Sequence, residues 1–121
     1  MVKTVLIVED NELNMKLFGD LLEARGYATL RATEGDGALA LAKREHPDLV
    51  LMDIQLPGLS GIEVTRRMKA DPRLRDIPVV AVTAFALRGD AERILGSGCS
   101  AYVSKPVSID NLLDVVERHA A

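Results

Sequence analysis

The sequence predicts an α/β domain in which five parallel strands carry helices on both faces. Apolar, strand-compatible runs alternate with segments of helical periodicity five times along the 121 residues. Strict alternation of this kind implies a parallel sheet built with right-handed crossovers. Each strand and helix together take about 24 residues, close to the size of a minimal βα repeat, so we expect one domain over residues 1–121.

The strand runs differ in how apolar they are, and this difference predicts their order. Residues 5–8, 49–52 and 79–82 form unbroken apolar runs, whereas 28–32 is mixed and 101–103 is short. Unbroken runs belong in strands that are buried on both faces, and mixed runs fit the edges of a sheet. We therefore expect the order 2-1-3-4-5, with the topological switch between the first and third strands.

The helical segments are bounded by residues with known capping and turn preferences. Helix starts are indicated by Asn11, Ser60 and Ser108, and helix ends by Gly26 and the X-Pro pairs at 46–47 and 71–72. Ser60 and Glu63 have the spacing of a capping box. These signals fall between the strand runs, so both sets of signals predict the same element order.

Composition excludes several classes of protein. The chain carries 15 basic and 18 acidic side chains, for a net charge of −3, and only four aromatic residues, which argues against a nucleic-acid surface or a base-stacking platform. The single Cys99 cannot form an internal disulfide. Neither a signal peptide nor an apolar stretch of membrane-spanning length is present. We expect a cytoplasmic protein without direct nucleic-acid binding or membrane insertion.

Chemically distinctive residues follow the strands of the predicted sheet. Glu9 and Asp10 follow the first strand, Asp53 follows the third, Thr83 the fourth and Lys105 the fifth. Ligands of such sheets bind at the carboxyl ends of the strands beside the topological switch. Three carboxylates, a hydroxyl and an ammonium group are therefore expected at one edge. Taken singly, an Asp after a strand also fits a turn former, and a Lys fits a solvated surface charge.

The grouped carboxylates favour a hard cation. Oxygen ligands with open positions for water suit Mg²⁺ better than Ca²⁺. Clustered carboxylates repel one another, and a divalent ion together with Lys105 relieves that repulsion. The ion would also neutralise an incoming phosphoryl group, as phosphoryl transfer to an aspartate requires. Asp53 is the predicted nucleophile, because it stands alone at the end of the most central strand.

Four segments carry a family resemblance. LIVEDNELN, LVLMDIQLPGLSG, VVAVTAFA and YVSKP resemble the receiver domain of bacterial two-component response regulators, which has a CheY-like, flavodoxin-like fold. VEDNELNMKLF, DIQLPGLSG and VTAFALRGD look closer still to DivK-type single-domain regulators, which act in cell division and cell-fate control in alphaproteobacteria. The resemblance covers essentially the whole chain and implies a phosphoacceptor switch without an effector domain, rather than an enzyme.

The resemblance implies a metal site centred on the phosphorylated residue. Asp53 would be phosphorylated, and Asp10 would bind Mg²⁺ directly. The backbone carbonyl of Gln55 would complete the ligands supplied by the protein. Many receivers have Asp where this chain has Glu9, which would act on the metal either directly or through water.

The resemblance also implies a response to phosphorylation. Lys105, followed by a cis peptide bond, would pair with phosphoryl oxygens. Thr83 would reach the phosphate through its hydroxyl, and Tyr102 would change rotamer. Gln55 and Phe85 would tune the lifetime of the phosphoryl group, with slow autodephosphorylation expected.

The partners implied by the resemblance are proteins. Histidine kinases of the DivJ and PleC kind would donate the phosphoryl group, and a kinase-like protein such as DivL would be a target. The receiver would be a monomer or a weak, phosphorylation-dependent dimer, and partners would recruit it to a cell pole.

Two other functions stay open at this point. A small Mg²⁺-dependent phosphatase would share the aspartyl-phosphate intermediate, but Gln55 stands where haloacid dehalogenase-like enzymes have a second Asp for proton transfer. A flavodoxin-like redox carrier follows from the fold alone. The acidic segment 9–12 would repel the phosphate of FMN, so the sequence favours the phosphorylation switch.

Overall fold

A computed structural model describes residues 2–84 and 90–120, and in these residues five strands alternate with five helices. The elements are β1 (Thr4–Val8), α1 (Glu12–Ala24), β2 (Ala28–Ala32), α2 (Gly35–Glu45), β3 (Leu49–Asp53), α3 (Gly61–Ala70), β4 (Val79–Thr83), α4 (Asp90–Gly96), β5 (Ala101–Ser104) and α5 (Ile109–Ala120). The strands form one parallel sheet in the order β2-β1-β3-β4-β5, which confirms the predicted topology.

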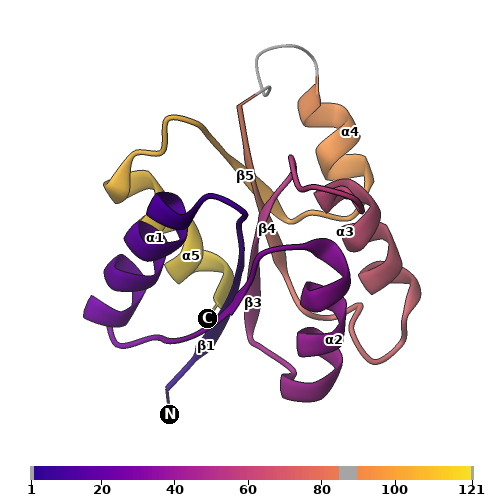
Figure 1. The fold of residues 1–121 in the computed structure, drawn as a ribbon, viewed down its shortest axis with the longest axis horizontal. Coiled ribbons are helices and arrows are strands. Elements are labelled where there is room, and N and C mark those ends of the chain that lie inside the picture. Colours follow the sequence, from indigo (N-terminus) through magenta and orange to yellow (C-terminus); the bar gives the residue numbers. More distant parts are fainter. Residues whose placement is uncertain (1, 85–89, 121) are drawn as a thin grey trace.

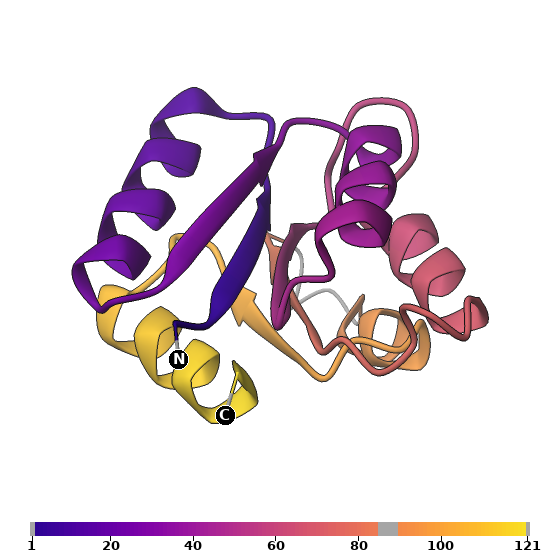
Figure 2. The same ribbon diagram turned by 90° about the horizontal axis from the view of Figure 1, so that it is seen from below.

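The helices form two layers, one on each face of the sheet. Helices α1 and α5 cover one face, and α2, α3 and α4 cover the other (Figures 1 and 2). Strands β1, β3 and β4 lie between both layers and are almost wholly buried, as their unbroken apolar runs predicted. In the described part of the chain, no helix is long and apolar enough to span a membrane.

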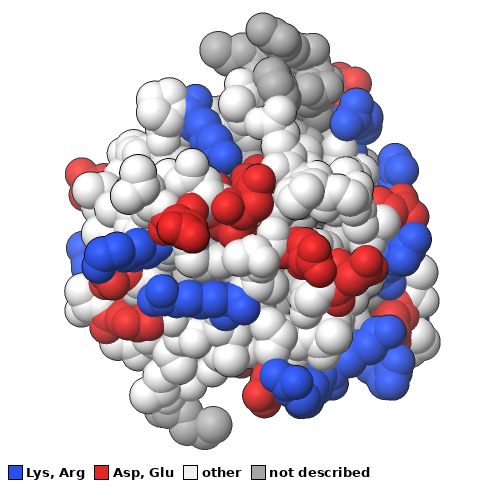
Figure 3. Space-filling view, viewed as in Figure 1, with Lys and Arg blue, Asp and Glu red and all other residues white. Residues whose placement is uncertain are grey.

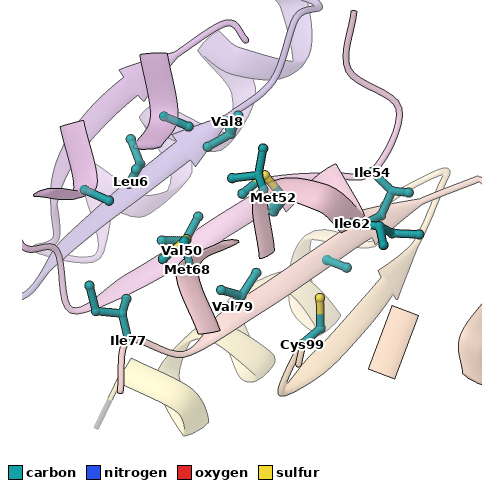
Figure 4. Packing of buried hydrophobic residues seen from close by; sticks show 14 of the residues in the cluster. Leu6, Val8, Val50, Met52, Ile54, Ile62, Met68, Ile77, Val79 and Cys99 are labelled. Carbon is teal, nitrogen blue, oxygen red and sulfur yellow. The ribbon is translucent and has the colours of Figure 1, made fainter. Parts of the chain in front are cut away.

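Alternating residues of each central strand supply two separate cores. In β3, Val50 and Met52 point toward the layer of α2, α3 and α4, where they join Met68 of α3 (Figure 4). Leu49 and Leu51 of the same strand join the core beneath α1 and α5. Burying each such side chain contributes about 1.5–3 kcal/mol, so the two cores hold the sheet and its helices together.

Polar side chains cap the helices that were expected to start at them. Asn11 Oδ1 accepts a hydrogen bond from the backbone N–H of Asn14 at 3.0 Å, and Ser60 Oγ accepts one from Glu63 at 3.2 Å. Ser108 caps α5 in the same way. Each cap satisfies an N–H group that lacks a partner within its helix, and these contacts confirm the predicted starts.

The turn between β3 and α3 depends on two glycines. Gly58 has φ = +71°, in the left-handed region that favours glycine. Gly61 begins α3 against the end of β3, where its N–H donates to the Ile54 carbonyl at 3.1 Å. A Cβ at Gly61 would overlap the Asp53 carbonyl oxygen and lie 2.8 Å from Ile54 Cα. The missing side chain lets α3 start directly beside the carboxyl end of β3.

Replacing Gly61 with alanine is expected to destabilise the fold by about 2 kcal/mol or more, because backbone atoms must move to admit the Cβ. Urea denaturation followed by circular dichroism measures the change. Gly37→Ala is the matched control, since the nearest neighbour of its Cβ would be Glu34 Cγ at 3.9 Å. That variant should be as stable as the wild-type chain or more so. A Gly61→Ala chain with wild-type stability would contradict the close approach.

Candidate functional site

The carboxyl edge of the sheet brings three carboxylates together. Glu9 and Asp10 follow β1 directly, and Asp53 is the last residue of β3. One carboxylate oxygen from each lies within 4.8 Å of the others. Figure 3 shows acidic side chains gathered near the middle of one face, with a basic side chain beside them. The convergence of these three residues was predicted from the strand order.

Both oxygens of the Asp53 carboxylate have partners. The backbone N–H of Gln55 donates to Oδ1 at 2.9 Å, and Lys105 Nζ donates to Oδ2 at 3.3 Å. The Lys105 backbone N–H in turn donates to the Thr83 carbonyl at 2.8 Å, which anchors this residue beside β4. The Lys105–Pro106 peptide bond is cis, as expected. The aspartate is thus buried, oriented and paired with a cation.

The two oxygens of Glu9 lie in unequal environments. Oε1 accepts a hydrogen bond from Asn14 Nδ2 at 3.1 Å and lies 3.9 Å from Lys105 Nζ. Oε2 is buried and has no hydrogen-bond partner within residues 2–84 and 90–120. Burial, with the adjacent Asp53 carboxylate, raises the pKa of Glu9 from an ordinary 4.5 to about 7, although Asn14 and Lys105 oppose the shift. The site therefore holds one carboxylate whose charge is poorly compensated.

The donor set fits a small, hard divalent cation. Glu9 and Asp53 are buried, whereas Asp10 is exposed, so one side of the cluster is open to water. Glu9 Oε2 is a buried acceptor without a partner, which a cation would satisfy. Gln55, whose backbone carbonyl was the fourth predicted ligand, is exposed two residues beyond Asp53. The residues at this edge can hold Mg²⁺ with water completing its coordination.

The predicted switch residues lie on one face of β4 and β5. Thr83 ends β4, is buried, and pairs in register with Ser104 of β5. Tyr102 pairs with Ala81 and packs against the core on the side of α2, α3 and α4. Because strand residues two apart share a face, Thr83 and Tyr102 are diagonal neighbours on that side. Phe85 lies outside the described residues.

Asn14 is a site residue that the sequence analysis did not identify. It lies in the first turn of α1, five residues after its partner Glu9, and the Asn11 cap fixes its backbone N–H. The only sequence signal is its position one helical turn after an acidic pair. That signal becomes informative only once the direction of α1 relative to β1 is known.

The fold, the acidic cluster and the paired lysine define a receiver, and the chain belongs to the response regulator receiver domain family, whose profile matches residues 5–117. It is similar over nearly its full length to the polar-differentiation response regulators DivK of Brucella ovis and Brucella anthropi. They are 59% and 58% identical to it over 119 residues, covering 98% of this chain and 97% of theirs. Both the family and the DivK resemblance are thereby confirmed.

Two solved structures extend the comparison. The receiver domain of a sensor histidine kinase from Pseudomonas aeruginosa PAO1 is 34% identical, with a TM-score of 0.92 and coverage of 99% of this chain and 98% of that one. That structure holds a magnesium ion coordinated in its active site cleft. The chemotaxis protein CheY4 of Vibrio cholerae, at 22% identity, shares the fold with a TM-score of 0.92 and coverage of 98% and 99%. The chain is a phosphoacceptor response regulator whose partners include histidine kinases.

Without metal, the stability of the wild-type chain should fall as pH rises from about 4.5 to about 7. Glu9 binds its proton more tightly in the folded state, so through this window the folded chain holds more protons than the unfolded chain and loses stability as pH increases. Urea denaturation in EDTA at several pH values measures the effect. In the Glu9→Gln chain, the fall in the free energy of unfolding across this pH range should be smaller by on the order of 2 kcal/mol. Parallel profiles for the two chains would contradict the raised pKa.

Proposed function

We propose that Asp53 accepts a phosphoryl group from a histidine kinase and that the modified residue signals through altered protein binding. The observation that carries this proposal is the Asp53 carboxylate itself, buried and held between the Gln55 N–H and Lys105 Nζ beside Glu9 and Asp10. The similarity of this protein to DivK over nearly its full length supports a role in cell division or polar differentiation.

The chemistry follows from the positions of these groups. Glu9, Asp10, Asp53 and the Gln55 carbonyl would hold Mg²⁺, which when bound supplies positive charge against the phosphoryl oxygens. An Asp53 oxygen forms a bond to phosphorus while the phosphorus–nitrogen bond of the phosphohistidine breaks and the imidazole leaves. The Gln55 N–H orients the carboxylate, and Lys105, 3.3 Å from Oδ2, pairs with a phosphoryl oxygen.

Residues of the neighbouring strands β4 and β5 would respond to phosphorylation. Thr83 donates its hydroxyl to the phosphoryl group, and Tyr102, on the same side of the sheet, changes rotamer in response. These movements bias a pre-existing equilibrium on the face formed by α4, β5 and α5. Gln55 is exposed two residues beyond Asp53 and would tune the lifetime of the phosphoryl group. The same role is proposed for Phe85, which lies outside the described residues.

The kinase would dock on apolar surface beside the site. Leu13 and Leu17 of α1 and Ile109 of α5 are exposed to 79%, 43% and 47%. Leu17 lines a groove of about 260 Å³ together with Asn14, Phe18, Lys105, Pro106 and Val107. An amphipathic helix bearing the phosphohistidine would insert an apolar side chain into this groove, and Lys105 connects the groove to Asp53.

Similarity to DivK supports partners of the DivJ and PleC kind, a kinase-like target such as DivL, and recruitment by them to a cell pole from the cytoplasm. The receiver would act as a monomer or a weak, phosphorylation-dependent dimer. Gln55 supports a switch rather than a turnover enzyme, because an amide two residues beyond Asp53 cannot transfer a proton. We therefore favour this function over a phosphatase.

Asp53→Asn should abolish phosphorylation, because an amide cannot act as the nucleophile. Incubation with a ³²P-labelled histidine kinase and Mg²⁺, followed by gel electrophoresis, measures label on the receiver. Asp20→Asn, which changes an exposed carboxylate of α1, is the control and should retain wild-type labelling. Label that persists on the Asp53→Asn chain would overturn the assignment.

Leu17→Asp should slow phosphotransfer from the kinase by about tenfold, because a charge replaces an apolar contact in the docking groove. Phosphorylation by acetyl phosphate, a donor too small to need the groove, should be unchanged. Leu95→Asp on α4 is the matched control, since Leu95 is 44% exposed and Leu17 is 43% exposed. Docking elsewhere is indicated if both leucine variants accept phosphoryl groups from the kinase at the wild-type rate.

A further inference from the structure

The hydrogen bond from Asn14 Nδ2 to Glu9 Oε1, 3.1 Å long, joins the first turn of α1 to the acidic cluster. The phosphoryl-transfer steps proposed above do not use it. We propose that Asn14 is a positioning residue for metal binding, which holds Oε1 so that the free oxygen of Glu9 is presented to the cation. This inference rests on the magnesium site of the proposed function and adds one residue to it.

The environment of Glu9 supports this assignment. Its carboxylate is 1% exposed, so it cannot rely on water to orient it. Oε1 has both nearby donors, Asn14 at 3.1 Å and the Lys105 ammonium at 3.9 Å. Oε2 has none within the part of the chain that the structure describes. A carboxylate held by one oxygen offers the other in a defined direction, as partners of metal ligands commonly arrange.

An amide suits this position better than a cation would. Asn14 donates a hydrogen bond but carries no charge, so it orients Glu9 without competing with Mg²⁺ for the negative charge. Its backbone is fixed by the Asn11 cap, whose Oδ1 accepts the Asn14 N–H at 3.0 Å. Glutamate has one more rotatable bond than aspartate, so an oriented Glu9 needs such a restraint more than a shorter carboxylate would.

Mg²⁺ affinity of the purified full chain, measured by isothermal titration calorimetry at fixed pH and salt, tests the inference. Asn14→Leu removes the donor and keeps the side chain close in size, so it should weaken Mg²⁺ binding by about tenfold. Asn14→Gln keeps an amide donor and should recover most of that loss. Asn111→Leu, in the first turn of α5, is the matched control and should bind as the wild-type chain does.

Asn14→Leu is then combined with Glu9→Gln, and the Mg²⁺ affinity of the double variant is compared with that of the Glu9→Gln background alone. If Asn14 acts through Glu9, Asn14→Leu should change the Mg²⁺ affinity of that background by less than about twofold. Should Asn14→Leu not fold, as judged by circular dichroism, Asn14→Ser carries the same test, because its hydroxyl is too short to reach Glu9. An equal loss in both backgrounds, or no loss in either, would overturn the positioning role.

These outcomes separate the inference from the function on which it rests. A wild-type chain that takes phosphoryl groups and binds Mg²⁺, with Asn14→Leu binding equally well, refutes the role of Asn14 and leaves the proposed function standing. A wild-type chain that binds no Mg²⁺ refutes both the metal site and the inference. A substitution that lowers only the unfolding temperature, with unchanged Mg²⁺ affinity, assigns Asn14 a structural role and also overturns the proposal.

Discussion

The functional site depends on one electrostatic constraint, which is the placement of three carboxylates around the Lys105 ammonium group at the carboxyl edge of the sheet. Lys105 lies 3.3 Å from Asp53 and 3.9 Å from Glu9, so one side chain compensates two acids from different strands. Asp10 adds a further charge at the surface. Burial and the adjacent Asp53 carboxylate raise the pKa of Glu9 even though Lys105 opposes the shift, so the compensation is incomplete. A site of this kind has higher affinity for cations than an isolated carboxylate has.

The parallel sheet makes this concentration of charge possible. Glu9, Asp53 and Lys105 are far apart in the chain and meet because each ends or directly follows a strand whose carboxyl end reaches the same edge. The two apolar cores hold those strands in register without help from the site. Because the cores supply the stability, the edge tolerates unfavourable charge, and such local conflict is typical of functional sites.

The site also joins the two helical layers. Lys105 leads into α5 and the layer that includes α1, whereas Asp53 leads through a short turn into α3. Gly61 lets α3 approach the Asp53 backbone closely. A change of charge at Asp53 would therefore act on connections to both faces of the sheet. Thr83 and Tyr102 lie on the side of α4, so a movement there has a direct path to the surface.

Strand order and the acidic cluster could be predicted from the sequence because both follow from local apolar runs and the residues that end them. The contact of Asn14 with Glu9 could not, since it depends on how α1 leaves β1. The close approach at Gly61 likewise depends on the path of a turn. The strand pattern places Thr83 and Tyr102 but does not describe their contacts with a phosphoryl group. The roles of these two residues in the phosphorylated state therefore stay predictions.

Incomplete compensation would give the site its proposed capacity to switch. Any group that binds only the folded chain stabilises it, by an amount set by its affinity and concentration. At this edge a cation would satisfy Glu9 Oε2, and a phosphoryl group would give Lys105 a new partner in place of Asp53 Oδ2. A fully satisfied cluster would gain little from either event. The buried Glu9 carboxylate, whose Oε2 has no partner among the described residues, would lower the stability of the resting receiver and for that reason would leave its structure responsive to phosphorylation.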